Sequence, residues 1–367
     1  MQLTFIGDIF PADELLTQGF GILSQTTDEH AACWTDDLRR TVGQADYIIG
    51  NLESPLVASV PQSKATFCGA PRFATLLKEA GVNVLHVANN HMLEHGPEGY
   101  RETLGVLQRE GIEVVGGMLQ GEPAIVTLSD GQSKVCVAGF CDETICHIHN
   151  PGLYAPLSTD LALRTLRRMQ QLGADVIIFT LHWGNEYIHL PSPRQRALAR
   201  TLIDHGAHLI VGHHPHVVQP YEHYGEGHIF YSLGNFCFDA LHSAAFATGM
   251  LAKVQVQQGR IEAVQTAGVE LCDVSLTEHL VRPLPPAAFS QHFDAVQAAY
   301  ARCRRLDDAA YAALYHKRQR RIHLQERLRM KWNLLADLLR PHHRYRRRYL
   351  KNLVRYVQYV LHKKHKH

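Results

Sequence analysis

The residues best suited to chemistry in this sequence are histidines, carboxylates and asparagines that closely follow short apolar runs. In α/β proteins the carboxyl ends of strands converge on one crevice, so polar residues at these ends often carry the chemistry. One such residue would be ordinary, but several run ends with the same residue types indicate a common site. Its predicted members are Asp8, Asn51, Glu53, Asn90, His91, His182, Glu186, His213, His214, His216 and Asn235.

Imidazoles and carboxylates together predict a site for divalent metal ions, with Zn, Mn or Fe as the expected metals. His214 and His216 are two residues apart on a segment expected to be extended, which would point both side chains to the same side. Two ions about 3.5–4 Å apart can clamp a phosphoryl group and deprotonate a water that attacks in line. Glu53 could bridge two such ions, and His91 could protonate the leaving oxygen. The residues therefore favour metal-dependent hydrolysis of a phosphorylated substrate.

Several of these residues also have a purely structural interpretation. Asp8 could cap a turn, and Glu53 could form a salt bridge within a loop. Asn90 could form hydrogen bonds in a tight turn, because Asn tolerates the left-handed conformation. Among the clustered histidines, His213 is the expected bystander to metal binding. Asn235 could either hold a turn or donate to a phosphoryl oxygen.

The elements that must position these residues are short strands that alternate with helices. Runs of strand length occupy residues 3–6, 47–50, 82–87, 113–115, 176–180, 208–211 and 229–232. Helical patterns occupy residues 72–80, 97–110, 160–172 and 191–205. Residues 124–139 and 250–269 are predicted to form hairpins. The alternation predicts an α/β layer fold, and the hairpins predict that its sheet is mixed.

Six sequence segments resemble the motifs of a known family. They are Asp8, GNLESPL at 50–56, ANNHMLEHG at 88–96, LHWGNEY at 181–187, GHHPHVVQPYE at 212–222 and YSLGNFCFD at 231–239. In this order and spacing they are similar to the bacterial CapA family of capsule (poly-γ-glutamate) synthesis proteins, over roughly residues 1–245. That family resembles the calcineurin-like metallophosphoesterases. The resemblance implies a metallophosphatase-like sandwich of two mixed β-sheets flanked by helices, and a role in making or exporting a capsule polymer or envelope glycan.

The resemblance also implies a role for each residue by its position. Asp8 and His216 would bind a first metal, Glu53 would bridge, Asn90, His182 and His214 would bind a second metal, and His91 would be the acid. Asn51, His213, Glu186 and Asn235 are assigned to substrate binding. The sequence departs from the phosphoesterase pattern at two positions, because Phe10 stands where an Asp-x-His start would place a histidine and Glu53 replaces the usual bridging Asp. The first metal would lack one imidazole, so one or two ions per chain are expected.

Charge is unevenly distributed along the 367 residues. The formal net charge is only +2, yet residues 1–300 contain 17 Lys+Arg against 31 Asp+Glu, and residues 301–367 contain 20 against 4. With 46% hydrophobic residues the chain can bury a large core, which excludes a disordered protein. We therefore expect a metallophosphoesterase-like domain over residues 1–282, followed by a linker and a basic helical C-terminal extension over residues 283–367.

Residues 340–367 combine Arg and Lys with apolar residues at helical spacing. This pattern is typical of a helix that lies on an anionic membrane, and it fits equally well a helix packed on the acidic body. Docking on a synthase is a further alternative. No recognition motif accompanies the charge, so nucleic acid is not the expected partner. The first residues show no signal-peptide pattern and the chain has no long apolar run, so we expect a cytoplasmic protein, at most peripheral to the inner face of the membrane.

Two other functions stay open on the sequence alone. The first is a non-catalytic assembly factor that uses the same crevice to bind a polymer or a phosphorylated carrier, and the absence of a histidine at Phe10 favours it. The second is a peptide or amide hydrolase, because an activated water can attack a carbonyl carbon as well as a phosphorus.

Overall fold

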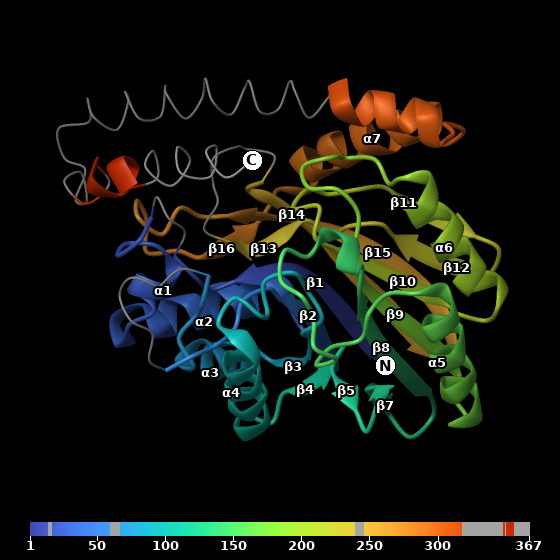
Figure 1. The fold of residues 1–367 in the computed structure, drawn as a ribbon, viewed down its shortest axis with the longest axis horizontal. Coiled ribbons are helices and arrows are strands. Elements are labelled where there is room, and N and C mark those ends of the chain that lie inside the picture. The colour runs from blue at the N-terminus through green and yellow to red at the C-terminus, as the bar shows by residue number, and fades with distance from the viewer. Residues whose placement is uncertain (14–16, 59–66, 239–245, 318–347, 349, 356–367) are drawn as a thin grey trace.

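The computed structural model of the protein describes residues 1–13, 17–58, 67–238, 246–317, 348 and 350–355. Two mixed β-sheets lie between helices (Figure 1). The eight-stranded sheet has the order β16-β15-β14-β1-β2-β3-β4, with β13 paired to β1, and the six-stranded sheet has the order β11-β12-β10-β9-β8-β7. The fold class predicted from the sequence is thus confirmed.

The strands of the eight-stranded sheet are β1 (Gln2–Phe10), β2 (Tyr47–Leu52), β3 (Val82–His86), β4 (Glu113–Val115), β13 (Asn235–Phe238), β14 (Thr248–Gln257), β15 (Arg260–Leu271) and β16 (Val281–Pro283). The strands of the six-stranded sheet are β7 (Ile125–Ser129), β8 (Lys134–Cys141), β9 (Val176–His182), β10 (Leu209–His213), β11 (Tyr221–Tyr224) and β12 (Gly227–Phe230). A small third sheet pairs β5 (Met118–Leu119) with β6 (Glu122–Pro123). Both predicted hairpins are confirmed, as the antiparallel pairs β7 with β8 and β14 with β15.

Parallel pairing brings the carboxyl ends of the strands that carry the predicted site to one edge of each sheet. In the eight-stranded sheet, Asp8 of β1 stands in register with Asn51 of β2 and with Asn235 of β13. In the six-stranded sheet, His182 of β9 stands in register with His213 of β10. The polar residues therefore leave the two sheets at neighbouring positions, although they are far apart in sequence.

The helices are α1 (Ile22–Gln25), α2 (Asp28–Val42), α3 (Arg72–Glu79), α4 (Gly96–Arg109), α5 (Thr159–Gln171), α6 (Pro193–Asp204) and α7 (Pro286–Cys303). The four predicted helices correspond to α3, α4, α5 and α6. Helix α6 begins as its sequence predicts, with Pro193 in the first turn and a capping box formed by Ser192 and Gln195. Sequence patterning does not predict α2, because its buried face includes the polar residues Thr35, Asp37 and Thr41.

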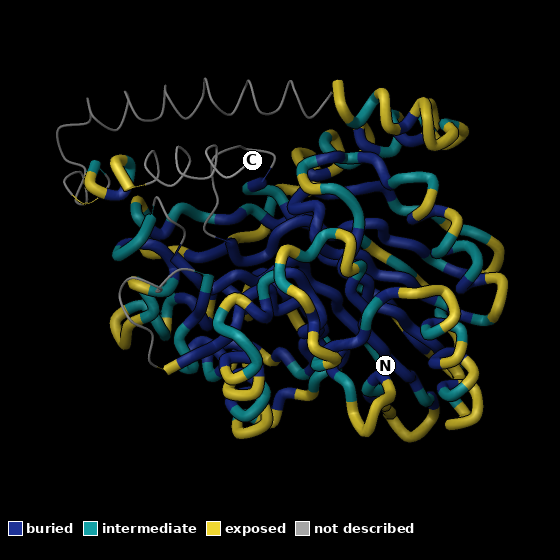
Figure 2. Tube along the Cα trace, in the orientation of Figure 1, coloured by how far each residue is buried: buried dark blue, intermediate teal, exposed yellow. Residues whose placement is uncertain are grey.

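The core consists of three apolar layers. Side chains such as Phe5, Val137 and Ile178 fill the space between the two sheets. Helices α2, α3 and α4 cover the outer face of the eight-stranded sheet, and α5 and α6 cover the six-stranded sheet, on opposite sides of the molecule (Figure 1). Strands β1, β2, β8, β9, β10 and β13 are consequently buried along most of their length, whereas many exposed residues lie on helices and connecting loops (Figure 2). Burial on both faces explains why the strands read as continuous apolar runs.

Residues after 283 contact the sandwich at several points. Phe289 of α7 joins the layer between the sheets, and the Tyr311 hydroxyl donates to the carbonyl oxygen of Leu190 at 3.2 Å. The domain boundary at residue 282 stays a prediction. Much of the predicted basic extension, residues 318–347, 349 and 356–367, lies outside the described residues.

A short helical part of the extension is described, residues 348 and 350–355. It contacts the body at residues 18 and 19, where Arg348 Nη1 donates to the carbonyl oxygen of Gly19 at 2.6 Å and Asn352 Nδ2 donates to that of Gln18 at 2.9 Å. Within the described parts of the chain, no helix has the length and apolar character that crossing a membrane requires.

Candidate metal centre

The predicted site residues lie together where the two sheets present their carboxyl ends. Most of them lie near the ends of strands or in the segments that follow, and Asn235 is the first residue of β13. Nine are buried, whereas His91 and Glu186 are more exposed. The buried residues are Asp8, Asn51, Glu53, Asn90, His182, His213, His214, His216 and Asn235. So many polar groups in one buried place require mutual partners or a bound ion, because an isolated buried polar group is costly.

Asn51 and Asp8 lie at the middle of a hydrogen-bond network. Asn51 Nδ2 donates to Asp8 Oδ1 at 2.8 Å, and Asn89 Nδ2 donates to Asn51 Oδ1 at 3.2 Å. The other carboxylate oxygen of Asp8 accepts from the backbone nitrogen of His214 at 3.2 Å. His213 Nδ1 lies 3.1 Å from Asp8 Oδ1. These contacts fix the orientation of the Asp8 carboxylate.

Two sets of ligand atoms share one carboxylate. The first set is Asp8, Glu53 and His216, and the second set is Glu53, His182 and His214. Asn90 extends the second set, because its Oδ1 lies 2.8 Å from His182 Nε2. Two sets with a common Glu53 form the arrangement expected of two cation sites bridged by a carboxylate.

The separations between ligand atoms fit coordination better than direct hydrogen bonding. Glu53 Oε1 lies 3.5 Å from His182 Nε2 and 3.6 Å from His216 Nε2. Both distances exceed those of a good hydrogen bond. Nitrogen and oxygen ligands bound tetrahedrally to zinc at about 2.0–2.2 Å are about 3.3–3.6 Å from one another. Glu53 therefore already has the spacing of a shared ligand to one histidine of each set.

Two buried atoms of the centre have no hydrogen-bond partner among the described residues. They are Oε1 of Glu53 and Nδ1 of His214. Such atoms are rare in folded proteins, and an ion is one of the ordinary explanations. Both residues belong to the second ligand set, so the residues present fit a bound divalent cation there.

The electrostatics of the centre favour a positive charge. Burial raises the pKa of Glu53 well above its usual value, while it lowers the pKa of His214 to about 4 and that of His182 well below its usual value. Burial acts in the same upward direction on Asp8, but hydrogen bonds from His213 and His216 outweigh it and hold the pKa of Asp8 well below its usual value. The neutral imidazoles of His182 and His214 are in the state that metal binding requires, and a bound cation would offset the burial that disfavours the Glu53 carboxylate.

His216 behaves differently from the other histidines. Burial opposes its protonation, but the charges of Glu53 and Asp8 raise the pKa of His216 to about 10. Without a metal, a proton on His216 would therefore partly neutralise the two carboxylates. An ion bound by the first set would take over this role and release that proton.

The loop after β10 carries backbone strain. His214 has φ 93° and His216 has φ 56°, a region that residues other than glycine seldom adopt. Tyr187, whose ring lies 6.1 Å from that of His216, has φ 66°. Strained residues of this kind persist where the surroundings hold them in place, and they cluster at functional sites.

His91 lies beside the centre and not inside a ligand set. Its ring stacks on Phe67 at 5.2 Å and meets Phe10 edge-on at 5.6 Å, and its Nδ1 lies 3.0 Å from Glu94 Oε1. Because Glu94 engages Nδ1, Nε2 is the nitrogen that remains for a substrate. Its position at the half-buried margin suits a group that exchanges protons with a substrate oxygen.

The four residues assigned to substrate binding occupy different places. Asn51 and His213 are buried against Asp8, and Asn235 Oδ1 lies 3.0 Å from His216 Nδ1. In these positions they orient candidate metal ligands, which is a supporting role that the sequence could not distinguish from substrate contact. Glu186 alone is exposed, and it forms a third ligand group with His214 and His216.

Sequence reasoning gave no role to two further residues of the network. His86 is fully buried at the end of β3, with Nδ1 2.6 Å from Thr180 Oγ1 and its ring 6.5 Å from that of His182. Asn89 anchors Asn51 and also donates to the carbonyl oxygen of Leu52 at 2.7 Å. A histidine inside an apolar strand run was the available signal for His86.

The first ligand set has an apolar wall where a further imidazole would be expected. Phe10 stacks on Phe238 at 4.6 Å, and the Phe238 ring lies 4.7 Å from that of His216. The two sets thus differ in ligands and in surroundings.

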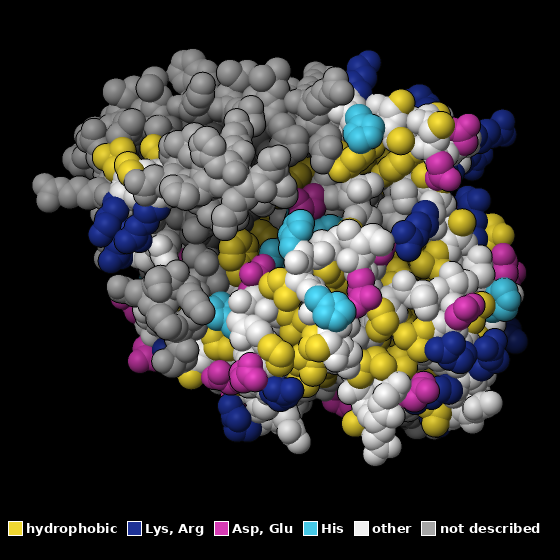
Figure 3. All heavy atoms as spheres, in the orientation of Figure 1, with side chains coloured by type: hydrophobic (Ala, Val, Ile, Leu, Met, Phe, Trp, Pro, Cys, Tyr) yellow, Lys and Arg dark blue, Asp and Glu magenta, His cyan; other side chains and the backbone are white. Residues whose placement is uncertain are grey.

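Over the visible face of the molecule, histidine and acidic side chains meet near the middle, and most Lys and Arg side chains lie toward the rim (Figure 3).

The described chain is thus a two-sheet α/β sandwich in which histidines and carboxylates gather in one buried place. The sequence matches the family described as bacterial capsule synthesis protein PGA_cap over residues 2–240. This match covers more than half of the chain, and the protein belongs to that family.

Individual relatives agree with this assignment. The chain is 35% identical to the capsule biosynthesis protein CapA of Bacillus anthracis over 213 residues, which are 53% of this chain and 51% of that protein. It is 33% identical to the PGA biosynthesis protein CapA of Bacillus subtilis, over 53% of this chain and 54% of that protein. The chain thus spans about half the length of these relatives.

Among solved structures, a 5′-nucleotidase precursor from Thermus thermophilus superposes with a TM-score of 0.47 at 14% identity, over 82% of this chain and 59% of that chain. A similarity of this extent supports no statement about function.

Proposed function

We propose that the protein is a metal-dependent, phosphoesterase-like hydrolase that acts in the synthesis or export of a capsule polymer, poly-γ-glutamate, or of an envelope glycan. The observation that carries the proposal is Glu53, whose buried carboxylate belongs to two ligand sets and has one oxygen without a hydrogen-bond partner among the described residues. One or two divalent ions, with Mn, Zn or Fe as the expected metals, would be held there.

In this proposal, different residues bind the metal and transfer the proton. Glu53 and Asp8, with His182, His214, His216 and Asn90, would hold the metal, which when bound supplies Lewis acidity and a water of lowered pKa. His91 would give a proton from Nε2 to the leaving oxygen, with Glu94 holding its ring. Phe10 and Phe67 exclude water from one side of that ring, because both rings contact it.

The substrate class follows from the names of the relatives and from the chemistry of the centre. Two relatives are named for capsule or PGA biosynthesis, and a third, from Mycobacterium tuberculosis at 27% identity, is named a probable polyglutamine synthesis accessory protein. A cationic metal centre suits an anionic polymer or a phosphorylated carrier. We place this activity in the cytoplasm, with residues 340–367 as a peripheral contact to anionic membrane or to a synthase.

Metal analysis combined with a hydrolysis assay tests the proposal. We expect protein purified without chelators to contain a divalent metal and to hydrolyse an aryl phosphate, and we expect His182→Ala to lose both the second ion and the activity. His205→Ala is the matched control, because His205 is exposed at the end of α6 and belongs to none of the ligand sets. Metal-free protein whose hydrolysis survives His182→Ala would contradict the proposal.

A non-catalytic binding factor is the second candidate, and the apolar wall at Phe10 favours it. With its first ligand set short of an imidazole, the centre could hold one ion and grip an anionic polymer without cleaving it. The metal-loaded protein would then bind poly-γ-glutamate, lose this binding on His182→Ala, and hydrolyse neither phosphoesters nor the polymer. Cleavage of the polymer alone would instead indicate an amide hydrolase.

Membrane contact is tested separately by co-sedimentation with anionic vesicles. We expect deletion of residues 340–367 to abolish co-sedimentation. Unchanged co-sedimentation of the shortened protein would contradict a role for the tail in membrane binding, and would leave the described contact with residues 18 and 19 as its remaining role.

A further inference from the structure

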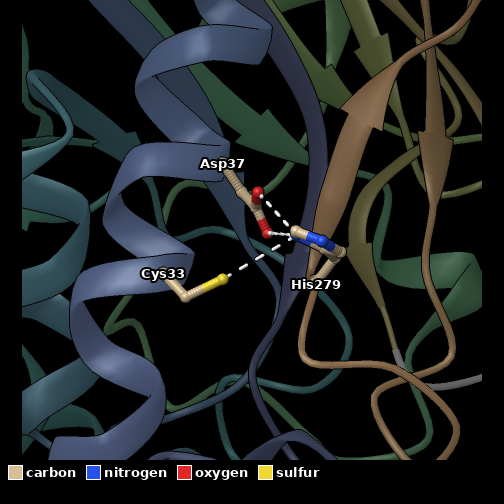
Figure 4. Close-up of side chains that lie close together, drawn as sticks. All are labelled: Cys33, Asp37 and His279. Atoms are coloured by element: carbon tan, nitrogen blue, oxygen red, sulfur yellow. Dashed lines mark hydrogen bonds and ion pairs between the residues drawn. The ribbon is translucent and has the colours of Figure 1, made fainter.

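A second group of metal-ligating side chains lies outside the centre described above and shares no residue with it. Cys33 and Asp37 project from α2, and His279 projects toward them from the connection between β15 and β16 (Figure 4). Their ligand atoms lie within 4.8 Å of one another. Sulfur, imidazole and carboxylate together form a donor set typical of zinc.

The sequence and the local fold both bring these side chains together where the β15–β16 connection packs on α2. Cys33 and Asp37 are four residues apart on a helix and therefore share one face. The backbone of the connection is fixed against this face, because Leu280 N donates to Asp37 Oδ2 at 2.9 Å and Trp34 Nε1 donates to the carbonyl oxygen of Glu278 at 3.0 Å. His279 lies between these two anchors, so its ring is presented to the helix.

The distances suit coordination. His279 Nδ1 lies 3.1 Å from Asp37 Oδ1, and Cys33 Sγ lies 3.7 Å from the same nitrogen. Around a tetrahedral zinc ion, with bonds of about 2.3 Å to sulfur and about 2.0–2.1 Å to nitrogen and oxygen, neighbouring ligands are about 3.3–3.6 Å apart. Small movements of two side chains would complete the geometry.

The charges around the cluster also suit a cation. Burial raises the pKa of the Cys33 thiol, and the carboxylates of Asp37 and Glu278 raise it further. A bound cation would offset these carboxylates and stabilise the thiolate. Arg40 pairs with Asp37, but its side chain is 57% exposed and could turn into solvent when an ion binds.

We propose that Cys33, Asp37 and His279 bind a zinc ion, with water as the fourth ligand. Binding releases the thiol proton of Cys33 to solvent, so the affinity should increase with pH. The His279 side chain is 54% exposed, which gives the ion a path from solvent. The ion would clamp the connection before β16 onto α2, and so hold the edge of the eight-stranded sheet.

Cobalt substitution tests this site apart from the first. Co²⁺ bound to a thiolate gives a near-ultraviolet charge-transfer band, and the centre at Glu53 contains no cysteine among its ligand sets. We expect this band in the metal-stripped full chain at stoichiometric Co²⁺, its loss in Cys33→Ala and in His279→Gln, and its retention in Cys303→Ala and in His182→Ala. Zinc should abolish the band by competition.

Alkylation provides the second readout. At a zinc concentration about 10 times the Kd only about one tenth of the protein is metal-free, so zinc should slow modification of Cys33 by iodoacetamide about 10-fold. His279→Gln should remove this protection. Thermal unfolding of each variant verifies that it is folded, and we expect His279→Gln to fold because the His279 side chain is 54% exposed. A band that persists in Cys33→Ala, a band seen only at large Co²⁺ excess, or equal alkylation with and without zinc would each overturn the proposal.

Discussion

The two ligand sets at Glu53 share one carboxylate but differ in what surrounds it. The second set adds His182, His214 and the amide oxygen of Asn90. The first adds Asp8 and His216, and Phe10 closes the side where another imidazole could stand. Nitrogen ligands strengthen binding of late first-row metals, so the second set should bind more tightly. The difference teaches that a bridging carboxylate alone does not make two equal sites.

The largest effect is expected for Glu53→Gln, which removes the charge that both sets share. We expect loss of both ions and a drop of more than about 100-fold in metal affinity, because removing even a supporting residue of a metal site costs about 10–100-fold. Elemental analysis after dialysis measures this. Glu94→Gln is the control for a carboxylate that lies beside the centre without being in a ligand set. Retention of one full ion in Glu53→Gln would show that the sets do not share this residue.

His182→Ala and His216→Ala should separate the two sets. We expect His182→Ala to lose the tighter ion and keep weak binding at the first set, and His216→Ala to lose only the weaker ion. Calorimetric titration of each metal-stripped variant resolves the two affinities. Identical titrations for the two variants would mean that the centre binds a single ion with all its ligands.

Phe10→His should add the imidazole that the first set lacks. Alternate residues of a strand point to the same side, so position 10 can reach the ion bound by Asp8. We expect the first-site affinity to increase by about 10-fold, with a loss of about 1–3 kcal/mol in stability from the broken contact with Phe238. Phe10→Leu controls for the lost aromatic contact. Equal titrations for the two variants would contradict the expected position of the first ion.

The smallest effect is expected in the pH dependence of the metal-free protein. The pKa of His216 is raised from 6.5 to about 10 in the folded state by Glu53 and Asp8, against the effect of burial. Its contribution to stability is therefore fully present below pH 6.5 and is lost as the pH rises toward 10. We expect Tm to fall by a few degrees across this window, less in His216→Gln and unchanged from wild type in His205→Ala. A Tm that rises equally in all three proteins would contradict this assignment.

The grouping of the candidate ligands was predictable, because their residue types and their positions after apolar runs can be recognised in the sequence. Short apolar runs ending in Asp8, Glu53, His182 or His214 indicated strand ends, and parallel strands bring such ends to one edge. The roles of Asn51, His213 and Asn235 were not predictable, because their present contacts depend on strand register. Helix α2 was not predicted, because Asp37, which is buried on its inner face, interrupts the apolar pattern.

By itself the sequence determined the fold class, the hairpins, and a set of metal-ligand types, because periodicity and residue chemistry are local properties. Only the tertiary structure decided which atoms meet. It joined Glu53 to two ligand sets, placed Phe10 and Phe238 beside the first, and brought His279 to Cys33 across more than two hundred residues. These long-range contacts depend on sheet register and on the packing of layers, which are set by the whole chain and not by any single segment.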